Sequence, residues 1–170
     1  MLELACGDGF NARNFYSLRS KHIVACDFDP KAIKIAQEKN SAPNIEFLLV
    51  DIRTEMPEGK FENVIWDGAI EHFTPAEIAK ILEVTKSRLT DDGLLSGYTI
   101  VERAVGEKSL SHHEYEFKSK EDLLRFFTPQ FRNVTVFETE YPERHNLYFW
   151  ASDGVLPFGT GWSKMLTYCR

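Results

Sequence analysis

The sequence of 170 residues lacks any apolar run near the roughly 20 residues that a helix needs to cross a bilayer. Its N-terminus lacks the basic segment and long apolar core of a secretory signal. Three cysteines fit neither an even disulfide framework nor a paired CxxC metal site. These absences exclude an integral membrane protein, and we expect a reduced, cytoplasmic protein.

Blocks of basic residues are missing as well. Lys and Arg together number 20 against 26 Asp and Glu, so the formal net charge is −6. The basic residues are scattered, and nothing in their pattern supports a nucleic-acid partner. No internal repeat and no linker rich in Pro, Gly or Ser divides the chain, and its length suits one domain.

Strand-like and helix-like patterns alternate along the chain, which is typical of a parallel sheet with helices on its faces. Asp29 is predicted to cap a helix that begins at Pro30, and Asp92-Gly93 is predicted to close the helix of residues 75–89. The other expected helices span residues 11–20 and 119–127. Strands are expected at residues 2–6, 22–26, 45–50, 61–66, 94–101, 134–138 and 147–151.

A glycine turn follows the first expected strand. Residues 7–12 read GDGFNA, a GxGxxA string between a strand and a helix. Glycines there allow a tight turn and the close approach of a ligand. Asp27 lies twenty residues after Gly7 at the end of the next strand, where an acid can accept hydrogen bonds from a ribose diol. The pattern fits either a dinucleotide or another adenosine-containing cofactor.

The string LELACGDGF resembles the first motif of class I S-adenosylmethionine-dependent methyltransferases, with Ala5 in place of the more usual first glycine. The resemblance continues, in the family's order and spacing, through VACDFDP, IEFLLVDI, FENVIWDGAIEHF and LTDDGLL. It implies a single Rossmann-like, three-layer α/β domain, with a mostly parallel seven-stranded sheet and an antiparallel last strand. The implied cofactor is S-adenosylmethionine, with S-adenosylhomocysteine as its product.

The resemblance also implies the residues that contact the cofactor. Asp27 would bind the ribose hydroxyls, Phe28 would lie against adenine, and Asp51 would accept from the adenine amine. An acidic rim suits a cofactor that carries a sulfonium and an ammonium but no phosphate. The implied cofactor-binding residues are Glu3, Ala5, Cys6, Gly7, Gly9, Asp27, Phe28, Asp51, Ile52, Asp67 and Gly68.

Candidate catalytic residues follow the fourth and fifth expected strands. Glu71 and His72 lie where the resemblance places the methyl group, and a histidine suits deprotonation of an acceptor near neutral pH. His112 and His113 are further candidates. They lie in a segment whose apolar residues follow neither helical nor strand spacing. Metal-dependent relatives that methylate the 2′-oxygen of RNA have an additional acid where this chain has Gly68, so no metal is expected.

We therefore expect a methyltransferase that acts by in-line displacement on a small-molecule acceptor, a hydroxyl in preference to an amine. Residues 1–151 would form the core, which begins at its first strand without the helices that in this family cover the cofactor. Residues 152–170 would be an irregular tail. A homodimer or another partner would then complete the lid. The alternatives are a cofactor-binding domain without catalysis, an NAD-dependent oxidoreductase and a metal-dependent RNA 2′-O-methyltransferase.

Overall fold

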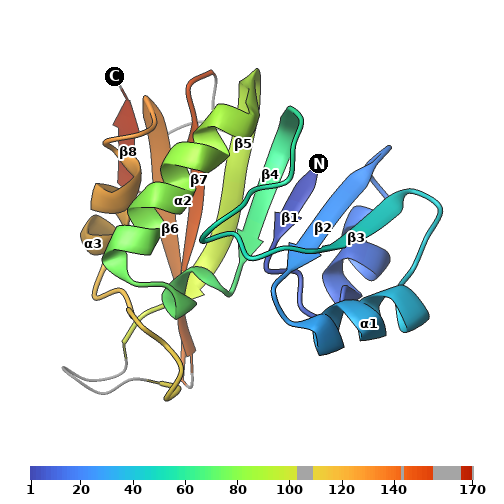
Figure 1. Ribbon diagram of the computed structural model, residues 1–170. Coiled ribbons are helices and arrows are strands. Elements are labelled where there is room, and N and C mark those ends of the chain that lie inside the picture. The colour runs from blue at the N-terminus through green and yellow to red at the C-terminus, as the bar shows by residue number, and fades with distance from the viewer. Residues whose placement is uncertain (103–108, 143, 155–165, 170) are drawn as a thin grey trace.

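The computed structural model describes residues 1–102, 109–142, 144–154 and 166–169 of the chain. The described segments form one mixed sheet in the order β3-β2-β1-β4-β5-β7-β6-β8 (Figure 1). Its strands are β1 (Leu2–Leu4), β2 (Ile23–Asp27), β3 (Ile45–Leu49), β4 (Phe61–Asp67), β5 (Leu89–Ile100), β6 (Asn133–Tyr141), β7 (Arg144–Ser152) and β8 (Leu166–Cys169).

The first five strands are parallel neighbours, and β7 is antiparallel to both β5 and β6. This confirms the mostly parallel α/β sheet, and β6 and β7 form an antiparallel hairpin. The sheet has one strand more than expected, because β8 pairs antiparallel with β6 at the outer edge. The expectation that residues 152–170 are irregular is therefore wrong for residues 166–169, and residues 155–165 lie outside the described part. This pairing satisfies backbone groups of residues 133–136 that would otherwise lie at the open edge of the sheet.

Local sequence signals set the bounds of the helices. In α1 (Pro30–Lys39) the side chain of Asp29 accepts a hydrogen bond from the Lys31 N–H, so the predicted cap is confirmed. A reciprocal capping box between Thr74 and Glu77 begins α2 (Pro75–Arg88). Ser119 caps α3 (Lys120–Phe127). No helix in the described ranges is long and apolar enough to cross a membrane.

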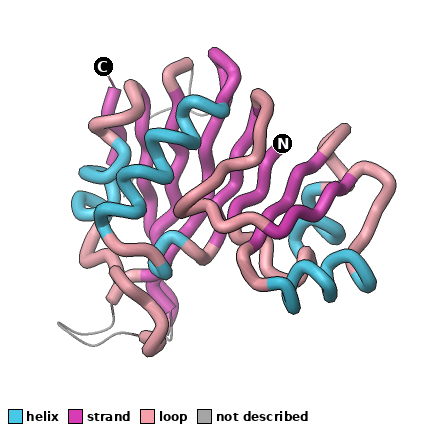
Figure 2. The backbone as a smooth tube through the Cα atoms, in the orientation of Figure 1, coloured by secondary structure: helices cyan, strands magenta, loops and turns pink. Residues whose placement is uncertain are grey.

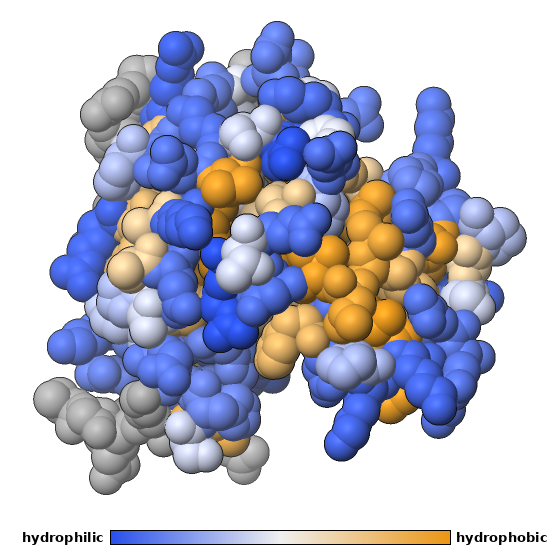
Figure 3. Space-filling view, viewed as in Figure 1, coloured by the Kyte–Doolittle hydropathy of each residue, from blue (hydrophilic) through white to orange (hydrophobic). Residues whose placement is uncertain are grey.

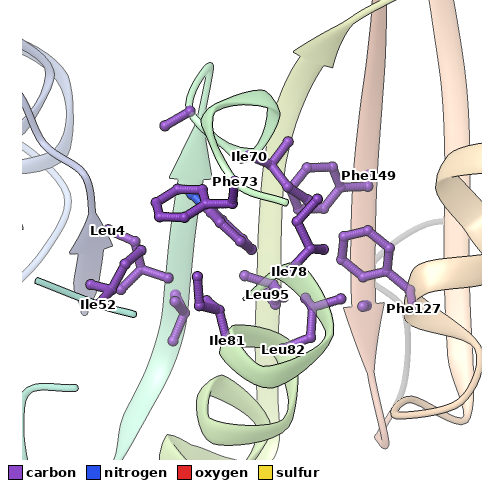
Figure 4. Packing of buried hydrophobic residues seen from close by; sticks show 14 of the residues in the cluster. Leu4, Ile52, Ile70, Phe73, Ile78, Ile81, Leu82, Leu95, Phe127 and Phe149 are labelled. Atoms are coloured by element: carbon purple, nitrogen blue, oxygen red, sulfur yellow. The ribbon is translucent and has the colours of Figure 1, made fainter. Parts of the chain in front are cut away.

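Helices cover both faces of the sheet, as Figure 2 shows. A π-helical segment, η1 (Ala12–Tyr16), and α1 pack on one face, against β2 and β3. Helices α2 and α3 pack together on the opposite face, α2 against β5 and α3 against β6. Between α2 and the strands is the larger apolar core, where Ile78, Ile81 and Leu82 meet Leu95 and residues of β1 and β7 (Figure 4).

The sequence prediction for Asp92-Gly93 is wrong. These residues do not close α2, because β5 begins at Leu89, directly after Arg88. They lie instead in a bulge, since Phe61 pairs with Leu89 whereas Asn63 pairs with Leu94. The Cβ of any larger residue at position 93 would lie 2.9 Å from the backbone of Thr90, so glycine is needed for the close approach of the chain to itself.

The carboxyl ends of the parallel strands share one edge of the sheet, at the lower side of Figure 1. The short 3₁₀ turn η2 (Ile70–His72) follows β4 at this edge. Figure 3 shows the molecule hollowed there, between the part that carries α1 and the part that carries α2. In open parallel sheets this edge is where ligands bind.

Candidate functional site

The loop after β1 turns back on itself through three residues with left-handed backbone conformation. Ala5, Gly7 and Gly9 have φ values of 53°, 55° and 75°. A Cβ at Gly9 would lie 2.6 Å from the ring of Phe47, so glycine is required there for packing. A Cβ at Gly7 would meet no atom within 4 Å. Gly7 therefore presents bare backbone to open space, which is the geometry that a closely approaching ligand needs.

Asp27 holds this loop in place. Its Oδ2 accepts a hydrogen bond from the Gly7 N–H at 2.9 Å, and its Oδ1 accepts one from the Asp29 N–H at 2.9 Å. The carboxylate is only 8% exposed. The spacing of twenty residues between Gly7 and Asp27 thus has a structural meaning, because it joins the end of β2 to the glycine loop.

Two carboxyl groups lie beneath the loop. Glu3 is 3% exposed, and its Oε2 has no hydrogen-bond partner. Burial, together with the nearby charge of Asp67, raises the pKa of Glu3 to about 8. Burial also raises the pKa of Asp67, although the hydrogen bond from Tyr16 opposes that shift. A buried acceptor without a donor beside a second acid is suited to a cationic ligand group.

Tyr16 belongs to the site, and the sequence analysis missed it. The Tyr16 hydroxyl donates a hydrogen bond of 2.5 Å to Oδ2 of Asp67, and burial raises the pKa of this phenol well above its usual range. Its position in the helical segment after the glycine loop was the only available signal. Cys6 is buried, which raises the pKa of its thiol, so the residue contributes backbone and packing rather than a thiolate.

The residues expected near adenine lie at the ends of β2 and β3. Phe28 is 63% exposed, and the guanidinium of Arg53 lies 5.6 Å from its ring centre. Arg53 also donates to both carboxylate oxygens of Asp51, at 2.9 and 2.7 Å, and this pairing lowers the pKa of Asp51. Ile52 points its side chain into the main core. Arg53 is a second residue that the sequence analysis missed.

A cavity of about 1000 Å³ begins at Gly68, beyond the carboxyl ends of β4 and β5. Its wall combines acids, imidazoles and aromatic rings from η2, from the segment after β5 and from the β6–β7 hairpin. The described residues that line it are Gly68, Glu71, His72, Tyr98, Ile100, Val101, Glu102, Ser109, Leu110, His113, Glu140, Tyr141, Pro142, Arg144 and His145.

Three of the four candidate catalytic residues, Glu71, His72 and His113, line this wall, and His112 stacks on His72 next to it. The ring of His72 stacks on that of His112 with centres 4.9 Å apart, and His113 lies edge-on to His72 at 4.9 Å. Burial lowers the pKa of His72, which favours its neutral form. Glu71 is buried and accepts a hydrogen bond of 2.9 Å from the Thr99 hydroxyl. His112 is exposed and is not part of the cavity lining.

The segment that carries His112 and His113 is attached to η2 through the backbone. The N–H groups of Glu114 and Tyr115 both donate to the carbonyl oxygen of Glu71, at 2.9 and 3.1 Å. On the opposite wall, Arg144 lies over the ring of Tyr98 at 5.7 Å. Sequence reasoning gave no sign of Tyr98 or Arg144, because their place in the wall depends on the pairing of β5 with β7.

Strand order, the glycine loop and the acids at the strand ends together define the class I S-adenosylmethionine-dependent methyltransferase fold. The profile of the family described as methyltransferase domain matches residues 1–93, more than half of the chain. The chain belongs to this family, and S-adenosylmethionine is the cofactor of its class. This assignment separates the chain from NAD-dependent oxidoreductases.

Among solved structures, the chain resembles one described as the DhpI–SAH complex, with a TM-score of 0.72 and 21% identity. The similarity covers 90% of this chain and 76% of that chain.

Among curated proteins, this chain is 26% identical over 185 residues to a malonyl-[acyl-carrier protein] O-methyltransferase of Bacillus anthracis, covering 100% of this chain and 68% of the relative. A protein of the same description from Bacillus cereus is 27% identical over 158 residues, covering 84% and 58%. The chain therefore spans only 58% to 68% of the length of these relatives.

Proposed function

We propose that this chain transfers a methyl group from S-adenosylmethionine to an oxygen of a small molecule held in the cavity beyond Gly68. The proposal rests on the position of Gly68, where the proposed cofactor site meets the cavity. This residue follows Asp67 on the proposed cofactor side and lines the cavity of about 1000 Å³ on the other. The cofactor supplies a methyl group activated by its sulfonium. The protein aligns the acceptor with that group and excludes water from the line of attack.

The residues beneath the glycine loop fit this cofactor. The unpartnered Oε2 of Glu3 is placed to accept from a cationic amino group, and bare backbone at Gly7 leaves room for the ligand. Asp27 would bind the ribose through the carboxylate that also holds Gly7, while Phe28 and Asp51 would contact adenine. The proposed cofactor-binding set is Glu3, Ala5, Cys6, Gly7, Gly9, Asp27, Phe28, Asp51, Ile52, Asp67 and Gly68.

On the acceptor side, the wall carries three imidazoles that can receive a proton from a hydroxyl, those of His72, His113 and His145. His72 and His113 lie together, whereas His145 is paired with Glu138 at 3.1 Å. Glu71 positions His72 and His113, because its side chain is fixed by Thr99 and its carbonyl oxygen holds the segment after His113. We therefore assign His72 as the proton acceptor, with His113 and His112 as its neighbours. A hydroxyl is preferred over an amine as the acceptor group.

A second candidate acceptor is a carboxylate, which needs no base. Two observations favour it: Arg144 places a guanidinium in the cavity wall, and the similar curated proteins are described as malonyl-[acyl-carrier protein] O-methyltransferases. An arginine guanidinium can donate to both oxygens of a carboxylate and so fix the orientation of the acceptor. The acceptor would then be an acyl group carried as a thioester.

A product assay on a panel of alcohols, phenols, amines and malonyl thioesters tests the proposal. The full chain is incubated with S-adenosylmethionine, and methylated products are identified by mass spectrometry. With a hydroxyl acceptor, His72→Asn should lower turnover by roughly 10²-fold or more, and Arg144→Ala should change it little. With a carboxylate acceptor the order of the two variants should reverse. His22→Asn, an exposed histidine paired with Glu46, is the control. Binding of S-adenosylhomocysteine without any product would contradict the proposed transfer.

A further inference from the structure

Three histidines form a cluster beside the acceptor cavity, two of them in its wall, and proton transfer to one base does not require three. The chain has five histidines in all, and His72, His112 and His113 are within one small cluster. Their ligand nitrogens all lie within 4.8 Å of one another. His72 comes from η2, whereas the other two come from a segment some forty residues later, so the cluster is a product of the fold.

Each of the two inner rings has a partner that orients it. The Nδ1 of His113 makes a short contact with Oε1 of Glu116, and both side chains are 2% exposed. Glu116 is held in turn by the N–H and the hydroxyl of Ser109, at 2.6 and 3.1 Å. The ring of His72 is held between its neighbours, stacked on His112 and edge-on to His113, with ring centres 4.9 Å apart in each case. Histidines that ligate a metal are oriented as His113 is, by a carboxylate or a carbonyl on the nitrogen that does not face the ion.

Two buried carboxylates near the histidine cluster can compensate the charge of a bound cation. Glu71, which precedes His72 in the chain, and Glu116, which contacts His113, are buried carboxylates at 4% and 6% exposure. The hydrogen bonds from Glu114 and Tyr115 to Glu71 keep the two segments together. A dication placed among three neutral imidazoles would therefore have two buried carboxylates nearby to compensate its charge.

We propose that His72, His112 and His113 bind one divalent transition-metal ion, zinc in the first instance, and leave a further coordination position open to the cavity. Three imidazole ligands and one open position are typical of a catalytic zinc site. Nitrogens at about 2.0–2.1 Å from zinc in a tetrahedral arrangement are about 3.3 Å apart. The ring of His112 is exposed and has room to turn toward this spacing.

The consequence for catalysis rests on the proposed function. An ion bound facing the cavity would polarise an acceptor oxygen and lower its pKa; His72 would then serve as a ligand, and solvent rather than His72 would take the proton. Metal binding itself does not depend on methyl transfer and is measured without it. The two claims can therefore fail separately.

The test uses the untagged full chain, stripped of metal with a chelator and titrated with Zn²⁺ by calorimetry and with Co²⁺ by visible absorption. We expect one ion per chain and the intense absorption of four-coordinate Co²⁺. His112→Ala, at an exposed position, should weaken binding by at least about tenfold, and Glu116→Gln by about 10- to 100-fold. His22→Ala and His145→Ala should bind as the unchanged protein does, because neither residue belongs to the cluster.

Folding is checked by circular dichroism and by binding of S-adenosylhomocysteine on the same samples. The inference is overturned if the folded chain takes up no stoichiometric ion, or if His112→Ala binds it as tightly as the unchanged protein. A chain that binds the ion but methylates nothing in the acceptor panel would overturn the proposed function and leave the metal site standing. A chain that methylates an acceptor equally well after chelation would overturn the catalytic consequence alone.

Discussion

The hydroxyl of Tyr16 reaches Oδ2 of Asp67 at 2.5 Å and so joins the helical segment after β1 to the carboxyl end of β4. This contact spans 51 positions in the sequence and lies beside the buried carboxyl of Glu3. It fixes the orientation of an acid that the proposed cofactor site uses.

Tyr16→Phe should therefore destabilise the protein without changing its shape. The variant removes the donor while Asp67 stays in place, and a buried acceptor left without its donor costs roughly 1–3 kcal/mol. The free energy of unfolding in urea measures the effect. Tyr141→Phe, at a tyrosine that is 64% exposed, is the matched control and should be neutral. Equal stability of Tyr16→Phe and the unchanged protein would show that the contact contributes nothing.

Glu3 should make stability depend on pH. Its pKa is about 8 in the folded protein against 4.5 for the ordinary group, so the folded state binds the extra proton between these values. The stabilisation that this proton provides is complete below about pH 4.5 and is lost as pH rises to about 8. Relative to Glu3→Gln, the unchanged protein should lose about 3–5 kcal/mol across that window.

Unfolding of both proteins in urea from pH 5 to pH 9 measures this difference. S-adenosylhomocysteine should reduce the pH dependence of the unchanged protein, because its cationic amino group compensates the ionised form of Glu3. Parallel stability curves for the two proteins over the whole range would contradict the prediction.

The two glycines of the loop should respond differently to the same substitution. Gly9→Ala places a Cβ 2.6 Å from the ring of Phe47, so it combines overpacking with a left-handed conformation and should cost about 2–5 kcal/mol. Gly7→Ala has open space around its Cβ and should cost only about 1–2 kcal/mol from its conformation. Its main effect should be on S-adenosylhomocysteine affinity, because the new methyl group enters the space proposed for the ligand.

Each alanine variant is thus the control for the other, with denaturation and calorimetry as the two measurements. If Gly7→Ala binds S-adenosylhomocysteine as the unchanged protein does, the cofactor does not approach this part of the loop.

Arg53→Ala should strengthen the binding of S-adenosylhomocysteine. Arg53 engages both oxygens of Asp51 and lies over Phe28, the two side chains proposed to contact adenine, so the ligand must displace it. The pair is partly exposed, at 44% and 32%, and such pairs are weak, so the gain should be no more than about fivefold. Calorimetry at low and high salt measures the gain. Weaker binding by the variant would mean that Arg53 holds the ligand.

The elements of the fold were largely predictable because their signals are local. Helix starts are marked by hydrogen bonds a few residues long: the predicted cap at Asp29 forms, and Ser119 caps the helix expected over residues 119–127. The dipeptide Asp92-Gly93 misled because the same residues suit a turn and a bulge. Which of the two forms depends on how β5 pairs with β4, and no local pattern reports that pairing.

The site was predictable only in part, because some of its contacts are local and others join segments far apart in the sequence. Gly7 and Asp27 have a spacing that reflects one turn and one strand, so their contact follows from the βαβ unit. The meeting of His72 with His112 and His113 depends on a segment that folds back after β5, and Arg144 reaches the cavity through a hairpin. These contacts join distant parts of the chain, and they determine the chemistry of the acceptor wall.

The proposed cofactor site and the wall of the cavity come largely from different parts of the chain, which meet where β4 lies between β1 and β5. The family profile ends at residue 93, and apart from Gly68, Glu71 and His72 the described lining of the cavity lies beyond that residue. Most of the described cavity wall thus follows residue 93, whereas the residues proposed to bind the cofactor precede it. A chimaera that exchanges the region after residue 93 with that of another family member should change acceptor preference while it keeps cofactor affinity.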